Sequence, residues 1–204
     1  MDNNTRSERT RDIVIQAALA IIARDGPRRL TLDAIAREAG ISKGGLMHQF
    51  RSKEAVLKAL LDYQAEYFDK FSQEYMAHTG AKSPEANLST QIAVAREAVT
   101  TQKSVAFAIL GAISEEPGLL SKFKKIDAKK IEAIKAEAVD PELATLRWYA
   151  ARGLLLSSLL GQCSLEDDER QRLFERLLDG TQWQQAPHFG NRLVIQADAE
   201  SERR

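Results

Sequence analysis

The sequence predicts an all-α fold in which a small N-terminal head joins a larger helical body. Apolar residues recur at helical spacing along most of the 204 residues. All five prolines lie between these periodic segments, where a helix has to end anyway. No convincing alternating run of the kind that forms a strand is present. With 44% hydrophobic residues, the chain can bury a substantial core.

The first expected helix precedes Gly26. Two apolar stripes with a spacing of four residues run along it, and Gly26 and Pro27 then end it. The stripes are Ile13, Ala17, Ile21 and Val14, Ala18, Ile22. They predict one buried face in the head.

The next segment, residues 31–50, has the pattern of a helix-turn-helix. Ala36, Gly40 and Leu46 lie at offsets of 0, 4 and 10. A small residue lets the second helix approach, a glycine adopts the left-handed turn, and an apolar residue anchors the second helix. Apolar neighbours complete the pattern: Leu32, Ile35 and Ile41. The pattern is typical of DNA-binding proteins, and a plain helical hairpin is the alternative.

Further helices are expected in the body. Ser52 can cap the first of them, and Glu54 then suits the helix dipole. The expected helices span 54–77, 85–101, 104–114, 118–137, 141–162 and 166–178. This organisation predicts a DNA-binding domain over 1–53, an effector-binding and dimerisation domain over 54–179, and a flexible tail over 180–204.

The last two helices predict an interface between two copies. Between Gly153 and Gly161 the first is apolar or small nearly all round, which is typical of a helix buried on every side. Ser164 can cap the second helix, which has its own apolar stripe. Together they predict a four-helix homodimer interface, and closure of the chain's own core is the alternative. The interface candidates are Gly153, Ser157, Leu160, Gly161, Phe174 and Leu177.

The segment GISKGGLMHQFRSKEAVLKAL and the helix before it resemble the head of TetR/AcrR-type transcriptional repressors, over roughly residues 8–62. Members usually have tyrosine where this chain has Met47, and often threonine where it has Gly45. The resemblance implies a ligand-responsive regulator, a repressor that binds a palindromic operator as a dimer and is released by a small molecule. A DNA-bound regulator whose body recruits a protein partner is the alternative.

Position then suggests roles in the contact with double-stranded DNA. Lys53 matches the lysine of the family that contacts phosphate, and Thr31 either caps its helix or contacts phosphate. His48 and Gln49 are candidates for base edges, unless His48 packs beside Phe50. The other candidates open the recognition helix: Ser42, Lys43, Gly44, Gly45 and Met47. Residues 1–58 carry 11 Lys and Arg and 7 Asp and Glu, whereas 59–204 carry 18 and 22. This asymmetry suits DNA binding at one end, although ordinary scatter of surface charge would also produce it.

The effector is expected to be apolar or amphipathic and anionic, within a pocket that the family places in the body. Arg152 precedes an apolar stretch, so it needs either a carboxylate partner or a ligand anion. The proposed wall residues have plain core as their alternative: Phe68, Phe71, Phe107, Leu110, Trp148 and Tyr149.

Other classes of function find little support. The three histidines are far apart, without metal-ligand spacing, and no nucleophile elbow or phosphate loop occurs. We therefore expect that the protein is not an enzyme and binds no metal ion and no cofactor. Cys163 is expected to be a buried, inert thiol. No apolar run is long enough to span a membrane, and the polar start is no secretory signal, so a cytoplasmic protein is expected.

Overall fold

The structure, a computed structural model, describes residues 3–101 and 117–183. Throughout these residues the regular elements are helical. The α-helices are α1 (Asn3–Asp25), α2 (Leu32–Glu38), α3 (Lys43–Gln49), α4 (Lys53–His78), α5 (Ala86–Thr101), α7 (Pro117–Glu137), α8 (Pro141–Leu159) and α9 (Asp167–Leu178). Three short 3-10 helices are η1 (Pro27–Arg29), η2 (Gly80–Lys82) and η3 (Gly180–Trp183). The expected all-α fold is confirmed.

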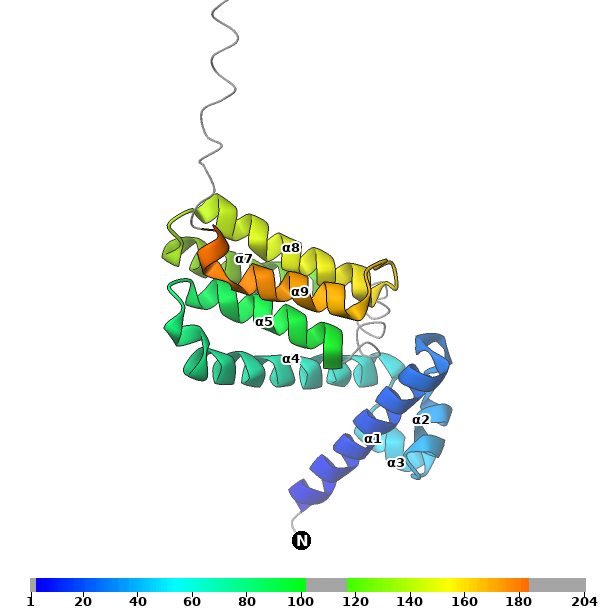
Figure 1. The fold of residues 1–204 in the computed structure, drawn as a ribbon. Helices are drawn as coiled ribbons and strands as arrows, with labels where there is room; N and C mark the ends of the chain where they lie inside the picture. The colour runs from blue at the N-terminus through cyan, green and yellow to red at the C-terminus, as the bar shows by residue number, and fades with distance from the viewer. Residues whose placement is uncertain (1–2, 102–116, 184–204) are drawn as a thin grey trace, which may run out of the picture.

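Helices α1, α2, α3 and the start of α4 form a head at one end of the molecule (Figure 1). Both apolar stripes of α1 lie in the core of the head, except that Ile13 is partly exposed. Gly40 adopts the left-handed conformation, with a φ of +67°, and turns the chain from α2 into α3. Ala36 and Leu46 are buried on either side of this turn. The predicted helix-turn-helix geometry is therefore present.

Each of the three helices that follow α1 begins at a side-chain cap. The hydroxyl oxygen of Thr31 accepts a hydrogen bond from the backbone N–H of Ala34 at 3.1 Å. Ser42 does the same for Gly45 at 3.0 Å, and Ser52 does so at the start of α4. Such caps satisfy N–H groups that have no partner within the helix.

Helix α4 belongs to both parts of the molecule. Its first turns, including Val56, Leu57 and Leu60, lie in the core of the head. Farther along, the Tyr67 hydroxyl donates to the carboxylate of Glu97 on α5 at 2.6 Å. The expected division at residue 53 therefore falls before residues that are part of the head core. One continuous helix connects the head to the body (Figure 1).

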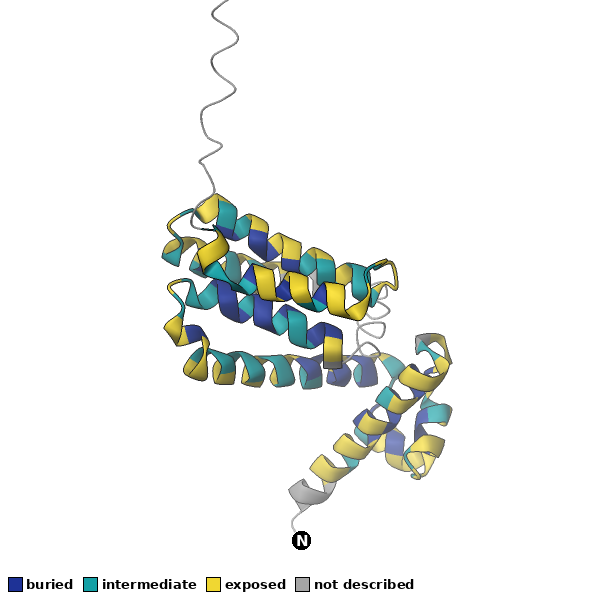
Figure 2. Cartoon of the chain, viewed as in Figure 1, coloured by how far each residue is buried: buried dark blue, intermediate teal, exposed yellow. Residues whose placement is uncertain are grey.

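Helices α5, α7, α8 and α9 pack together over the far part of α4 (Figure 1). Their shared core includes Leu88, Ile92, Trp148 and Phe174. The faces turned away from this core are exposed, as Figure 2 shows for α9. No described helix is long and apolar enough to cross a membrane.

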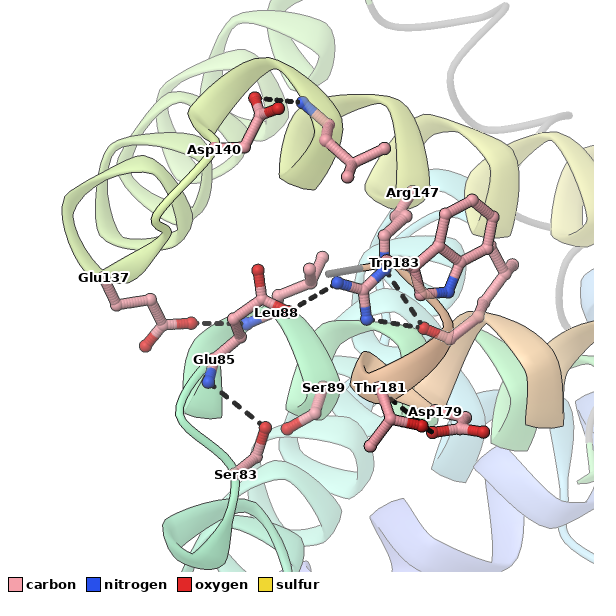
Figure 3. Close-up of polar contacts among 12 residues, drawn as sticks. Ser83, Glu85, Leu88, Ser89, Glu137, Asp140, Arg147, Asp179, Thr181 and Trp183 are labelled. Atoms are coloured by element: carbon pink, nitrogen blue, oxygen red, sulfur yellow. Dashed lines mark hydrogen bonds and ion pairs between the residues drawn. The ribbon is translucent and has the colours of Figure 1, made fainter. Parts of the chain in front are cut away.

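A buried arginine ties three helices of the body together. Arg147 of α8 is only 3% exposed, and it forms an ion pair with Glu85, which precedes α5. Its guanidinium also donates two hydrogen bonds to the carbonyl of Leu177 on α9, at 2.8 and 3.3 Å. The ring of Trp183 lies over this guanidinium, as Figure 3 shows. Glu137, at the end of α7, accepts from the backbone N–H of Leu88 nearby at 2.9 Å.

Two expected helix ends differ from the structure. Helix α8 ends at Leu159, earlier than expected, and Gly161, just after this end, adopts the left-handed conformation with a φ of +67°. Helix α9 begins after Glu166, not after Ser164, because the Glu169 carboxylate accepts from the backbone N–H of Glu166 in a capping box. The expected helix at 104–114 lies outside the described residues.

Candidate nucleic-acid interface and effector site

The recognition helix α3 presents most of its candidate residues to solvent. Leu46 is fully buried and fixes the helix against the head core. The outward face then consists of exposed residues: Ser42, Lys43, Gly44, Gly45, Met47 and His48. Gln49 is half-buried. A short helix held from behind and exposed along its other face is what a major-groove contact needs.

Lys43 is paired in the free protein. Its ammonium lies 2.8 Å from a carboxylate oxygen of Asp33 on α2, and both side chains are more than half exposed. Surface pairs of this kind contribute at most about 1 kcal/mol. Lys43 can therefore leave Asp33 for a phosphate at little cost.

Gln49 has a hydrogen-bond partner on α1 that no pattern in the sequence indicates. The Ser7 hydroxyl, near the start of α1, donates to the Gln49 side-chain oxygen at 3.1 Å. With that oxygen engaged, the amide nitrogen supplies the donors that remain for a base or a phosphate. The first turns of α1 thus lie against the end of the recognition helix.

The first two residues of α4 are Lys53 and Glu54, and the surroundings of Glu54 stabilise its charged carboxylate. Lys53 is half-buried. The neighbouring Glu54 is hydrogen-bonded to Ser52, and this bond is the main reason why the pKa of its carboxyl lies below the ordinary value. Its own backbone N–H and the charge of Lys53 add to this effect.

The residues proposed as a ligand wall do not all face the interior. Tyr149 is about half exposed on the outer side of α8, so it is not a wall of an internal pocket. Trp148 points inward and is part of the body core. Phe68 and Phe71 on α4 are half-buried. Phe107 and Leu110 lie outside the described residues.

Arg152 has a protein partner. Its guanidinium forms an ion pair with Asp127 of α7, and it lies over the rings of Trp148 and Tyr149, 5.4 and 6.0 Å from their centroids. Of the two possibilities that the sequence left open, the structure thus supplies the carboxylate. Arg152 as a contact for the effector stays a prediction.

Three buried polar atoms lack a hydrogen-bond partner within the described part of the chain. They are the side-chain oxygens of Gln64 on α4 and Gln91 on α5, and the indole nitrogen of Trp148 on α8. An unsatisfied buried polar group costs about 1–3 kcal/mol, and native proteins contain few of them. These atoms are candidates for contacts with a bound molecule.

Helix α8 carries an exposed apolar stripe on its outer face. Leu146, Tyr149, Leu156 and Leu160 are all exposed, and the exposed Gly153 lies in line with them. The spacing of three and four residues keeps them on one side of the helix. Exposed apolar residues in such an array mark a surface for association.

Not every interface candidate lies on this surface. Gly153, Leu160 and Gly161 are exposed, whereas Ser157 is half-buried and its hydroxyl donates to the Leu154 carbonyl at 3.2 Å. Phe174 and Leu177 are 1% and 7% exposed and pack into the chain's own core, so they cannot reach a partner. On α9 the outward apolar residue is the neighbouring Leu173.

Cys163 is half-buried rather than fully buried. Its thiol has a pKa below the ordinary value, mainly because of a hydrogen bond with the backbone at Leu165. Hydrogen bonds with Ser158, Ser157 and Arg170 act in the same direction, against desolvation. The expected full burial is therefore corrected, and the inertness of this thiol stays a prediction. Among the described residues, no group of His, Cys, Asp or Glu could hold a metal ion.

Comparison with known families covers both parts of the chain. Residues 14–60 match the family model of bacterial regulatory proteins of the tetR family. Residues 85–182 match the tetracyclin repressor-like C-terminal domain. The chain belongs to the TetR family. It is a helix-turn-helix transcriptional regulator, and the matched families are regulators, not enzymes.

Curated relatives of this TetR-family regulator match over part of their length. An uncharacterized HTH-type transcriptional regulator, YuxN of Bacillus subtilis, is 34% identical over 92 residues, which are 45% of this chain and 31% of that protein. The regulator SrpR of Pseudomonas putida is 42% identical over 55 residues, 27% of this chain and 26% of SrpR. The chain thus spans about a third or less of these relatives.

Solved structures share the fold over most of the chain. A TetR transcription regulator from Haloarcula marismortui aligns with a TM-score of 0.64 at 18% identity, over 85% of this chain and 98% of that one. A putative transcriptional regulator from Saccharomonospora viridis, in complex with choline, also aligns with a TM-score of 0.64 at 19% identity. The alignment covers 86% of this chain and 96% of that one. The multidrug binding protein EbrR, complexed with ethidium, aligns with a TM-score of 0.55 at 21% identity, over 82% of this chain and 97% of EbrR.

Proposed function

We propose that two copies of this regulator bind a palindromic operator, repress transcription there, and release the DNA when a small organic molecule binds in the body. The observation that carries the proposal is the continuity of α4. The same helix contributes Val56 and Leu60 to the head core and Tyr67 to the contact with α5. A change in how α4 packs on the body would therefore move the head.

DNA contact is assigned to the exposed side of α3 and the residues around it. Lys43 and Lys53 would contact phosphates, which position the protein but carry no sequence information. His48 and Gln49 would contact base edges. Gly44 and Gly45 leave the start of the helix open for a close approach. Thr31 would use its hydroxyl proton toward a phosphate while its oxygen caps α2.

A dimer is needed because a single recognition helix reads only a few base pairs. Two heads held about 34–36 Å apart, or a multiple of that distance, reach successive major grooves of one DNA face. The stripe from Leu146 to Leu160 on α8, with Leu173 on α9, is the surface we assign to the second copy. Pairing α8 and α9 with their counterparts would bury this stripe in a four-helix interface.

An effector in the body is supported by unsatisfied polar groups inside an apolar core. Gln64, Gln91 and Trp148 come from three different helices, and each has a buried polar atom without a partner in the described chain. The fold relatives crystallised with choline and with ethidium carry ligands. By the same fold, this chain is assigned an effector of its own.

The test begins with selection of binding sites from random duplex DNA. We expect an enriched palindrome and a complex of two or more chains per site in sedimentation experiments. A reporter gene downstream of this palindrome should be expressed less when the regulator is present. An enriched sequence without dyad symmetry, or binding by monomers, would contradict the proposal, and increased reporter expression would replace repression by activation.

A further inference from the structure

A cavity of about 190 Å³ lies between α5 and α9, near the end of α5 and the start of α9. Two arginines, Arg96 of α5 and Arg170 of α9, line it from opposite helices. The other lining residues are Val99, Thr100, Asp167, Gln171 and Phe174.

Among the described residues that line the cavity, arginines outnumber carboxylates. Arg170 is only 8% exposed and forms an ion pair with Asp167, whose side chain is 82% exposed and thus largely in water. Arg96 forms no ion pair with any described residue. Among the lining residues two guanidinium groups thus face one carboxylate, and Arg170 is also hydrogen-bonded to Cys163. At the start of α9 the positive end of the helix dipole meets three carboxylates, Asp167, Asp168 and Glu169, and only Asp167 of these lines the cavity.

The remaining lining defines the kind of anion. Val99 and the buried ring of Phe174 offer an apolar surface. Gln171 and Thr100 are polar, and their side chains donate to Glu175 and to the Glu97 carbonyl. The volume is below the roughly 300–1,000 Å³ of pockets for drug-sized ligands, so the molecule has to be small. Guanidinium groups bind carboxylates with paired hydrogen bonds, and they repel cations such as choline.

We propose that the α5–α9 cavity binds a small organic carboxylate, whose charge lies between Arg96 and Arg170 and whose apolar part contacts Val99 and Phe174. Its regulatory meaning rests on the proposed function. Arg170 and Leu173 lie three residues apart on α9; Arg170 lines the cavity, and Leu173 is exposed. A carboxylate that joins α5 to α9 therefore stabilises one position of the helix that contributes to the dimer surface.

The test uses matched pairs of carboxylates and neutral amides: acetate and acetamide, butyrate and butyramide, benzoate and benzamide. Thermal unfolding and titration calorimetry of the full chain should detect at least one carboxylate, with its amide binding at least tenfold more weakly. Arg96→Gln should weaken carboxylate binding roughly tenfold, the loss expected for a charge-assisted contact. Arg172→Gln is the matched control, because this exposed arginine of α9 is not part of the cavity. It should leave carboxylate binding unchanged.

Equal binding of a carboxylate and its amide would overturn the inference, as would undiminished binding to a folded Arg96→Gln variant. Absence of binding by all three carboxylates would overturn it as well. The proposed function fails separately. If choline raised the unfolding temperature and released the selected DNA while no carboxylate bound, the regulator would stand without this cavity. If a carboxylate bound in an Arg96-dependent way but no palindrome were enriched, the cavity would stand without the operator.

Discussion

Two exposed helical glycines offer a way to find where other molecules approach this chain. Gly44 on α3 and Gly153 on α8 lie within helices, and a Cβ built on either would meet nothing within 4 Å. Glycine in a helix is less favourable than alanine by roughly 0.5–1 kcal/mol. In the isolated chain, alanine should therefore be the better residue at both positions.

Gly44→Ala and Gly153→Ala should each raise the free energy of unfolding of the isolated chain by about 0.5–1 kcal/mol, because neither added methyl group meets an obstacle. The functional effects should differ. If DNA approaches α3 closely, the methyl group at position 44 crowds that contact, which typically costs 1–3 kcal/mol or about 5–150-fold in affinity. At position 153 the same crowding should weaken the dimer instead.

Urea unfolding measures the free energy of unfolding of each variant. Fluorescence anisotropy with the selected duplex measures the DNA affinity, and sedimentation equilibrium measures the affinity of the dimer. Each variant is the control for the other, since both add one methyl group to an open helical site. Unchanged DNA affinity of Gly44→Ala would refute a close approach at this glycine. A lower urea midpoint in the monomeric chain would refute the premise that the sites are open.

Three further predictions address single contacts. Lys53→Ala should weaken binding to selected and random DNA alike and lower the slope of log affinity against log salt concentration by about one. Gln49→Ala should instead change the base preference at one or two positions. Salt titrations of both variants on both DNAs test this, and a changed base preference of Lys53→Ala with an unchanged salt slope would show that the roles are reversed. Arg147→Met leaves the carboxylate of Glu85 without its partner, so urea unfolding should show a loss of about 3 kcal/mol, and a loss below 1 kcal/mol would contradict its role as the tie between α8 and α9. Because the pKa of Cys163 is lowered, its thiolate should persist to lower pH than in the unfolded chain. The pH midpoint of its alkylation by iodoacetamide should therefore lie below that of the urea-unfolded protein, and an equal or higher midpoint would be inconsistent with the hydrogen bonds described.

The sequence alone determined the helices and the head, because the signals for both are local. Periodic apolar residues lie within one or two turns of each other, caps act over three residues, and a turn needs a glycine such as Gly40 at a single position. For this reason Thr31, Ser42 and Ser52 were recognisable as helix starts. The exposed candidates on α3 follow from the same local geometry once Leu46 is known to face inward.

Only the tertiary structure decided which side of an evenly apolar helix faces the core. Helix α8 has little asymmetry in its sequence, so the burial of Trp148 and the exposure of Tyr149 depend on the helices packed against it. The same holds for its arginines. Arg147 became the buried tie because Glu85 and the end of α9 come to it from distant parts of the chain, while Arg152 found Asp127 on α7.

The cavity and the contact between Ser7 and Gln49 also depend on residues that are far apart in sequence. Arg96 and Arg170 face one space only because α5 and α9 pack side by side, and Ser7 reaches Gln49 only because α1 passes the end of α3. Local sequence specifies how each helix forms and where it begins. Which side chains meet is decided by the packing of complete helices, since that packing minimises exposed apolar surface over the whole chain and no short segment encodes it.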